Sequence, residues 1–286
     1  MRRFAAALAL AYWLPGCADE AAIPGEDAAQ DPGSRAAACE THAPLLELVG
    51  TADGIMLGEM HGTQQSAEVL GCVVRAAALT GKEVVLSLEM SEDPGARASS
   101  LEESGSVGRS VASPETVCEV AGLFAEGLVR VSFHVPYSGR MRPTGGLDQT
   151  FHEEGRAQLV KAELRPDRFV IALSGWRHVE DRFSTGEDGY VSATAGHFLP
   201  ASVPTVRLVS GIGGRARNCI FGGGCGVNSI EPHGGLQPHA LRPDPHGNFD
   251  FLYDVGPLTP SSGLDDFARC PGYSRAFSVG RAPVEG

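Results

Sequence analysis

The sequence contains no run of basic residues and, after its first seventeen positions, no apolar segment long enough to cross a bilayer as a helix. Its formal net charge is −12, from 23 Lys and Arg against 35 Asp and Glu. Proteins bind nucleic acids largely through Lys and Arg on phosphate groups. We therefore expect no nucleic-acid partner.

Several familiar site signatures are also missing. The GxSxG turn that presents a serine nucleophile does not occur, so a serine hydrolase site has no support. The glycine run at residues 222–224 is not followed by Gly-Lys-Ser/Thr, which excludes a phosphate-binding loop of that type. No CxxC pair is present, so disulfides are a better explanation of the cysteines than a metal site.

The amino-terminal residues resemble an export signal. Two arginines precede an apolar stretch, residues 4–14, that is too short for a mature transmembrane helix. The following Leu14-Pro15-Gly16-Cys17 resembles a lipobox, although Pro15 replaces the usual small residue. We expect residues 1–17 to be a lipoprotein signal peptide and Cys17 to carry the lipid that anchors the chain to a bilayer. The alternative is an ordinary signal peptide beside an unrelated cysteine.

Residues 18–38 are rich in Ala, Gly, Pro and acidic residues, which predicts a flexible tether. Ala18 stands where Asp would signal inner-membrane retention, so the outer membrane is the expected location. The six cysteines after Cys17 are an even number, as expected for disulfides in an oxidising compartment. Their connectivity is open, and Cys219 with Cys225, which enclose a glycine-rich loop, is the first pair we expect.

From residue 39 onward, short apolar segments alternate with segments of helical periodicity. The predicted strands cover 54–57, 83–90, 128–134, 168–173, 203–209 and 249–255, and the predicted helices cover 63–80, 114–127 and 151–165. This alternation predicts one α/β domain over residues 39–286, with a mostly parallel sheet flanked by helices on both faces. Residues 211–247 are expected to form a long ordered loop held by disulfides.

Polar residues stand at the ends of three of the predicted strands. Glu59 and His61 follow the first strand, Glu89 ends the second, and His178 follows a later one. Sites in open α/β sheets collect at the carboxyl ends of strands. If the three strands are neighbours, the four side chains converge. They then suit either a metal held by two His and a carboxylate, or a metal-free site with His as general base.

Three motifs carry a family resemblance over about residues 50–255. Met56–Thr63, Leu86–Met90 and Ser174–His178 resemble the ordered motifs of the group that contains ChaN-type haem-binding lipoproteins, Tiki/TraB-type metalloproteases and erythromycin esterases. The resemblance implies an α/β fold in which Glu59, His61, Glu89 and His178 line one pocket. It does not fix the reaction, because members bind haem, cleave peptides with a divalent metal, or hydrolyse a macrolide ester.

Two features depart from that pattern. Trp176 and Arg177 replace the small or amide residue expected before the second histidine, and Arg177 is a candidate to bind an anionic group or to pair with a carboxylate. The tyrosine ligand of the haem-binding members has no clear counterpart. Tyr137 is a candidate by its position after a predicted strand.

The leading hypothesis is an envelope hydrolase that activates water against an ester or amide of a small-molecule or peptide substrate. His61 would act with Glu59 or Glu89, or a divalent transition metal would be held by His61, Glu89 and His178, with Arg177 stabilising developing negative charge. The alternatives are a haem- or iron-binding lipoprotein that uses Tyr137, and a surface protein without catalysis.

Overall fold

The main sheet is built around β1, near the middle of its strand order. The computed structural model describes residues 39–94, 96–97, 113–136, 148–185, 191–220, 224–262 and 270–278. Within them, a seven-stranded sheet has the order β10-β11-β7-β1-β4-β2-β3. Neighbouring strands run parallel except β10 against β11. The strands are β1 (Gly54–Glu59), β2 (Glu83–Ser91), β3 (Arg130–Val135), β4 (Arg168–Gly175), β7 (Thr205–Val209), β10 (Leu241–Pro243) and β11 (Phe251–Asp254).

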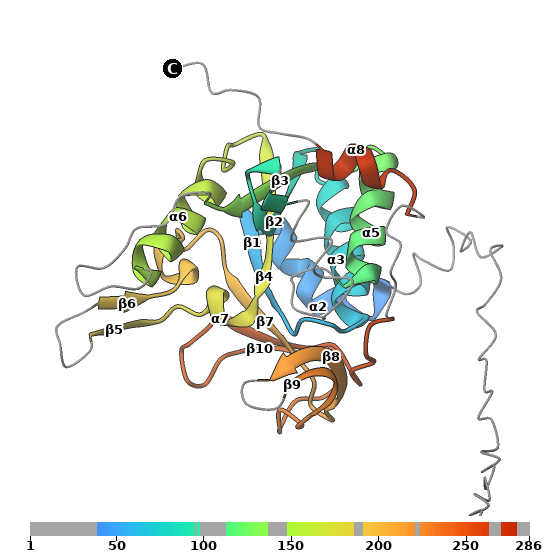
Figure 1. The fold of residues 1–286 in the computed structure, drawn as a ribbon, viewed down its shortest axis with the longest axis vertical. Coiled ribbons are helices and arrows are strands. Elements are labelled where there is room, and N and C mark those ends of the chain that lie inside the picture. The colour runs from blue at the N-terminus through green and yellow to red at the C-terminus, as the bar shows by residue number, and fades with distance from the viewer. Residues whose placement is uncertain are drawn as a thin grey trace, which may run out of the picture.

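Helices cover both faces of this sheet, which confirms the predicted fold class (Figure 1). One apolar core joins the strands to α3 and α5, and a second core on the opposite face joins them to α6 and α7. The two cores alternate along each strand: Leu57 belongs to the first and Met56 to the second. The helices are α2 (Ala43–Leu46), η1 (Glu47–Gly50), α3 (Gln65–Ala78), α5 (Pro114–Ala125), α6 (Gln149–Lys161), α7 (Trp176–Val179), η2 (Ala195–Phe198) and α8 (Tyr273–Ser278).

The order of the strands brings the predicted site residues to one place. The chain builds β1, β2 and β3 with α3 and α5 on one face, then returns over the other face through α6 and inserts β4 between β1 and β2. It then continues on the far side of β1 with β7. The carboxyl ends of β1, β4 and β2 are therefore neighbours, at a point where the direction of winding reverses.

Two local predictions were wrong. Residues 211–247 are not a single long loop, since they form the antiparallel hairpin of β8 (Gly214–Ile220) and β9 (Gly224–Ile230) and also contribute β10. A hairpin satisfies the backbone N–H and C=O groups of its two strands locally, so a glycine-rich segment can form regular structure outside the main sheet. The helix predicted from residue 63 begins two residues later, at Gln65, and the Thr63 hydroxyl donates to Met60 O. A smaller hairpin pairs β5 (Phe183–Thr185) with β6 (Val191–Ala193).

Disulfides join segments that lie far apart in the sequence. Cys39 is bonded to Cys72 of α3, and Cys118 of α5 is bonded to Cys270, just before α8. Such bonds persist in oxidising compartments, so the protein is extracytoplasmic. Cys219 lies opposite Cys225 in the β8–β9 pairing, but their side chains and residue Cys17 are outside the described residues. The predicted 219–225 bond and the lipid anchor therefore stay predictions.

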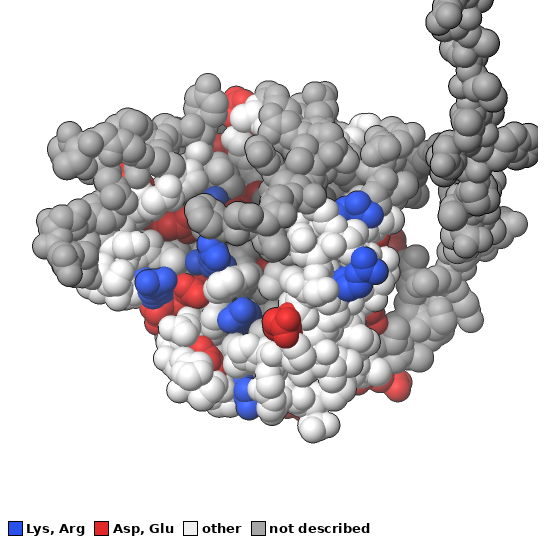
Figure 2. Space-filling model, turned by 60° about the horizontal axis from the view of Figure 1, so that its bottom comes forward, with Lys and Arg blue, Asp and Glu red and all other residues white. Residues whose placement is uncertain are grey.

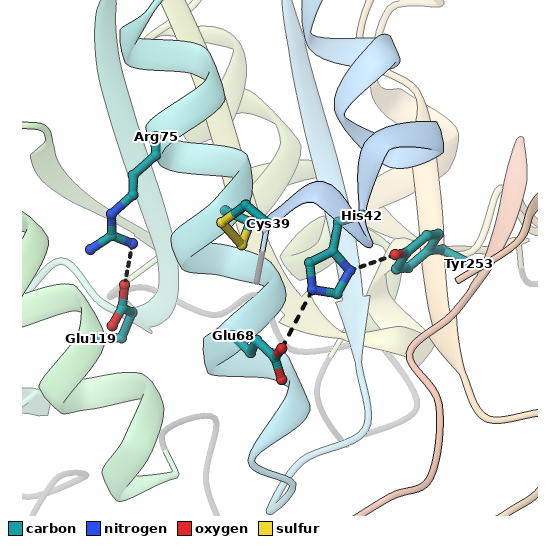
Figure 3. Close-up of a disulfide and its surroundings, with 7 residues drawn as sticks. Cys39, His42, Glu68, Arg75, Glu119 and Tyr253 are labelled. Atoms are coloured by element: carbon teal, nitrogen blue, oxygen red, sulfur yellow. Dashed lines mark hydrogen bonds and ion pairs between the residues drawn. A yellow bond between two sulfur atoms is a disulfide. The ribbon is translucent and has the colours of Figure 1, made fainter. Parts of the chain in front are cut away.

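The first described residues are held against the sheet beside the Cys39–Cys72 bond (Figure 3). His42 is buried, with Nδ1 2.5 Å from the Tyr253 hydroxyl and Nε2 3.8 Å from a carboxylate oxygen of Glu68. Hydrogen bonding with His42, aided by the charge of that residue, lowers the pKa of Glu68. In the described part of the chain, no helix has the length and apolar character that crossing a membrane requires.

Replacing Cys118 and Cys270 together by Ala should lower the free energy of unfolding by about 2–4 kcal/mol, because the bond closes a long loop in the unfolded chain. Urea unfolding of the oxidised proteins measures this change. The double replacement of Cys39 and Cys72, which spans a shorter loop, is the matched comparison and should cost less. Equal stability of the first variant and the native protein would contradict the pairing.

Candidate active site

Strand β2 places Ser87 and Glu89 on the face covered by α6. They lie on the same side of the strand as the apolar Val85 and alternate with apolar residues that face α3. Glu89 is 7% exposed and lies beside the end of β4. Its Oε2 accepts a hydrogen bond from the Ser174 hydroxyl at 2.8 Å and another from the Gly175 N–H at 2.7 Å. Backbone and side chain of β4 thus bind one oxygen of this carboxylate.

The other carboxylate oxygen of Glu89 takes part in a ring of four alternating acidic and basic side chains, which we call the charge square: Glu89, His178, Glu153 and Arg156. Glu89 Oε1 lies 3.2 Å from His178 Nε2 and 3.1 Å from Arg156 Nη1. Glu153 Oε1 lies 2.8 Å from His178 Nδ1 and 3.5 Å from Arg156 Nε. Glu153 and Arg156 are three residues apart on α6, which puts both on the face toward the sheet. A protonated His178 can donate from both ring nitrogens at once.

These contacts keep Glu89 ionised despite its burial. Burial alone would raise the pKa of the carboxyl group. The positive charges of His178, Arg156 and His61, together with the Gly175 N–H, outweigh burial and lower the pKa of Glu89 to about 2. At neutral pH the site therefore contains a Glu89 carboxylate and not a carboxylic acid.

A chain of hydrogen bonds runs from Glu89 into the sheet. The Ser174 hydroxyl donates to Glu89, so it can accept from His134 Nε2, 3.4 Å away. His134 Nδ1 then accepts from the Ser87 hydroxyl at 3.1 Å. His134 is fully buried, and burial, aided by the charge of Arg156, lowers its pKa to about 3. A neutral His134 fits this directed chain, whose donors all point toward Glu89.

His61 is held by Glu59 at the adjacent end of β1. Its Nδ1 lies 3.0 Å from Glu59 Oε1, and Glu59 is buried whereas the His61 side chain is 29% exposed. Burial by itself lowers the pKa of His61, but the hydrogen bond and charge of Glu59, with the charge of Glu89, raise it above 6.5. In the neutral ring Nδ1 carries the proton toward Glu59, so Nε2 keeps its lone pair.

Two glycines make this placement possible. Nε2 of His61 packs against Gly175, where a Cβ atom would come within 2.6 Å of the nitrogen. Gly62 has φ +76, and a Cβ there would overlap the carbonyl oxygen of Arg217 on β8. The Arg217 N–H donates to Gly62 O at 2.8 Å, so the β8–β9 hairpin fixes the turn that carries His61.

The structure brings together Glu59, His61, Glu89 and His178, as the strand-end argument predicted. Arg177 is exposed and stacks on Trp176, 5.3 Å from the ring centroid, whereas the guanidinium among the carboxylates belongs to Arg156. Tyr137 lies outside the described residues.

The charge square does not fit the predicted metal site. Both oxygens of Glu89 are already engaged by Ser174, the Gly175 N–H, His178 and Arg156. Among the described residues, no group of three or more His, Cys, Asp and Glu is arranged to hold a metal ion. Metal binding by His61, Glu89 and His178 stays a prediction, and we derive no step through a metal.

Sequence reasoning missed Glu153, Arg156 and His134. The Glu153-x-x-Arg156 pair interrupts the face of α6 that carries the buried Ala157 and Val160, which is a usable signal for buried charges. His134 ends a buried strand, as the recognised site residues do, but its partners come from β2 and β4, which no local pattern identifies.

No protein-family model and no curated protein matches the sequence. Among solved structures, the chain is similar to RRSP, a MARTX toxin effector domain from Vibrio vulnificus CMCP6, with 15% identity and a TM-score of 0.40 over 78% of this chain. Two structures of bacterial protein toxins match at 16% and 15% identity, each with a TM-score of 0.38, over 68% and 63% of this chain. The chain covers only 41%, 40% and 40% of these three, and the similarity assigns no family.

Glu89→Gln should remove a pH-dependent part of the stability. The lowered pKa stabilises the folded state above pH 4.5, and this contribution is lost as the pH falls from 4.5 toward 2. At pH 7 we expect the variant to lose on the order of 3 kcal/mol and to depend less on pH below 4.5. Urea unfolding between pH 7 and 2.5 tests this, with the exposed Glu154→Gln as control. Parallel curves for the native protein and Glu89→Gln would refute the assignment.

Proposed function

We propose that the protein is an extracytoplasmic hydrolase in which His61, oriented by Glu59, is the general base that activates water against an ester or amide. The observation that carries this proposal is the Glu59–His61 pair. A buried carboxylate fixes Nδ1, and the partly exposed ring leaves Nε2 at the carboxyl ends of three neighbouring strands.

The chemistry requires only groups already present. Neutral His61 accepts a proton from water at Nε2 while the water oxygen attacks the carbonyl carbon. The imidazolium is stabilised by the Glu59 carboxylate and then donates the proton to the leaving alkoxide or amine as the carbon–oxygen or carbon–nitrogen bond breaks. The products are a carboxylic acid and an alcohol or amine.

The charge square supports the Glu59–His61 pair by fixing the backbone against which His61 packs. Glu89 binds the Gly175 N–H, and Gly175 is the residue against which His61 Nε2 packs. The negative charge of Glu89 also helps to raise the pKa of His61. We assign Glu89, His178, Glu153 and Arg156 a positioning and electrostatic role, not contact with the substrate.

The family resemblance and the envelope location belong to the same proposal. Membership in the ChaN, Tiki and erythromycin-esterase group would account for Glu59, His61, Glu89 and His178 at one edge. Acylation of Cys17 would place the hydrolase on the outer membrane. A hemin titration followed by absorbance separates this proposal from the haem-binding alternative, which needs Tyr137.

His61→Ala should reduce kcat/KM by about 10²–10⁴-fold on any ester or peptide that the native protein hydrolyses, because the general base is lost. The matched control is His197→Ala, because His197 is exposed and its Nδ1 lies 2.7 Å from an Asp181 oxygen, a residue outside the charge square and the Glu59–His61 pair. Unfolding curves of both variants check that the fold is kept. Hydrolysis at the native rate by His61→Ala, or none by the native protein on a broad ester and peptide panel, would exclude the proposal.

Glu59→Gln should move the pH dependence as well as the rate. His61 acts as a base only when neutral, so the rate of the native enzyme rises with pH through a pKa above 6.5. Removing the Glu59 charge lowers that pKa, so the rising limb of kcat/KM should shift to lower pH while the maximum falls. A limb that stays at the native position would mean that another group is titrating.

A further inference from the structure

Arg207 lies in an unusual environment beside the site. Its guanidinium carbon stands 4.2 Å from the ring centroid of Trp176 and 5.7 Å from that of Phe249. The side chain is partly buried, and burial is the main cause of a lowered pKa. Over the described ranges of the chain, it makes neither an ion pair nor a side-chain hydrogen bond that would use its five N–H donors. A desolvated arginine stacked on two rings still has donors for a ligand.

The backbone connects this arginine directly to the catalytic pair. Arg207 on β7 is the register partner of Gly58, the residue before Glu59. Trp176 covers Gly58, where a Cβ would come within 3.0 Å of the Trp176 Cα atom. Trp176 also follows Gly175, the residue that contacts His61 Nε2. Trp176 therefore contacts Arg207 and is the chain neighbour of the glycine against which His61 packs.

The acidic groups closest to Arg207 do not neutralise it by direct contact. Glu180 and Asp244 influence its charge but form no ion pair with it. Asp244 is occupied, because its carboxylate accepts the backbone N–H groups of His246, Asn248 and Phe249. His233 and Arg242 add basic groups on the loop side. Figure 2 brings forward the bottom of the view in Figure 1, where α7 and the β8–β9 hairpin lie. Basic side chains stand among acidic ones on this face, although the chain carries a net charge of −12.

We propose that Arg207 and Trp176, with the exposed Arg177 on the same ring, form a subsite that binds a carboxylate on the substrate. The guanidinium groups would bind the carboxylate, and the Trp176 ring would contact the adjoining apolar part. The inference rests on the proposed function only in calling the bound molecule a substrate. The expected substrate is then an ester or amide that carries a carboxylate near the bond to be cleaved. An uncharged ester or amide would not use this subsite.

Trp176 provides the readout. The chain has two tryptophans, Trp13 and Trp176, so in the full chain with Trp13→Phe all tryptophan fluorescence comes from Trp176. The probes are phenylacetate and its neutral isostere phenylacetamide, titrated over the millimolar range. We expect saturable quenching by phenylacetate and roughly tenfold weaker binding of the amide, the difference that one charge-assisted hydrogen bond makes. Arg207→Gln should abolish this preference.

Arg165→Gln, at the opposite end of the sheet and exposed, makes the same change in net charge and should keep the preference. Equal binding of the two probes, no saturable signal from phenylacetate, or an unchanged preference in Arg207→Gln would each overturn the subsite. Because the signal is binding, the result is independent of turnover. A protein without hydrolase activity that still prefers phenylacetate would refute the proposed reaction and keep the subsite.

Discussion

The carboxyl edge of this sheet depends on one buried negative charge, the Glu89 carboxylate. A charge removed from water is strongly destabilising unless opposite charges and hydrogen-bond donors surround it. Here the donors come from β4, and the cations come from α6 and α7. Moving any of these elements would leave part of the charge square unpaired, so Glu89 fixes the relative positions of two helices and a strand.

The rigid part of the site is the charge square. The Glu59–His61 pair is separate from it but in contact with it. Glu89, Glu153 and Arg156 of the charge square are buried, whereas His178 and His61 are both partly exposed, and His61 depends on its own carboxylate, Glu59. The contact between them is Gly175, which donates its N–H to Glu89 and lets His61 approach because it has no side chain. The neutral His134 extends the rigid part through Ser174 without adding another charge to the interior.

Two disulfides and one hairpin hold the segments around the site. The disulfides fix the first described segment to α3 and the segment before α8 to α5, on the face opposite α6. The β8–β9 hairpin fixes the His61 turn through Gly62, and Trp176, which stacks with Arg207, follows the glycine against which His61 packs. Segments after β4 in the sequence thus hold the His61 turn, whereas the charge square combines β2 and α6 with α7.

The sequence by itself determined six of the seven strands of the main sheet, the three longest helices, the α/β class and four polar residues at strand ends, because these follow from local periodicity and from the rule that sites lie at carboxyl ends. It also indicated an oxidising compartment through its cysteines. Only the tertiary structure decided that β4 lies between β1 and β2, that Arg156 and not Arg177 faces Glu89, and that Glu59 is the partner of His61. The physical reason is that a buried charge selects its partners by distance in three dimensions, and Glu89 takes them from α6 and from the end of β4, segments that no local pattern in the sequence connects to it.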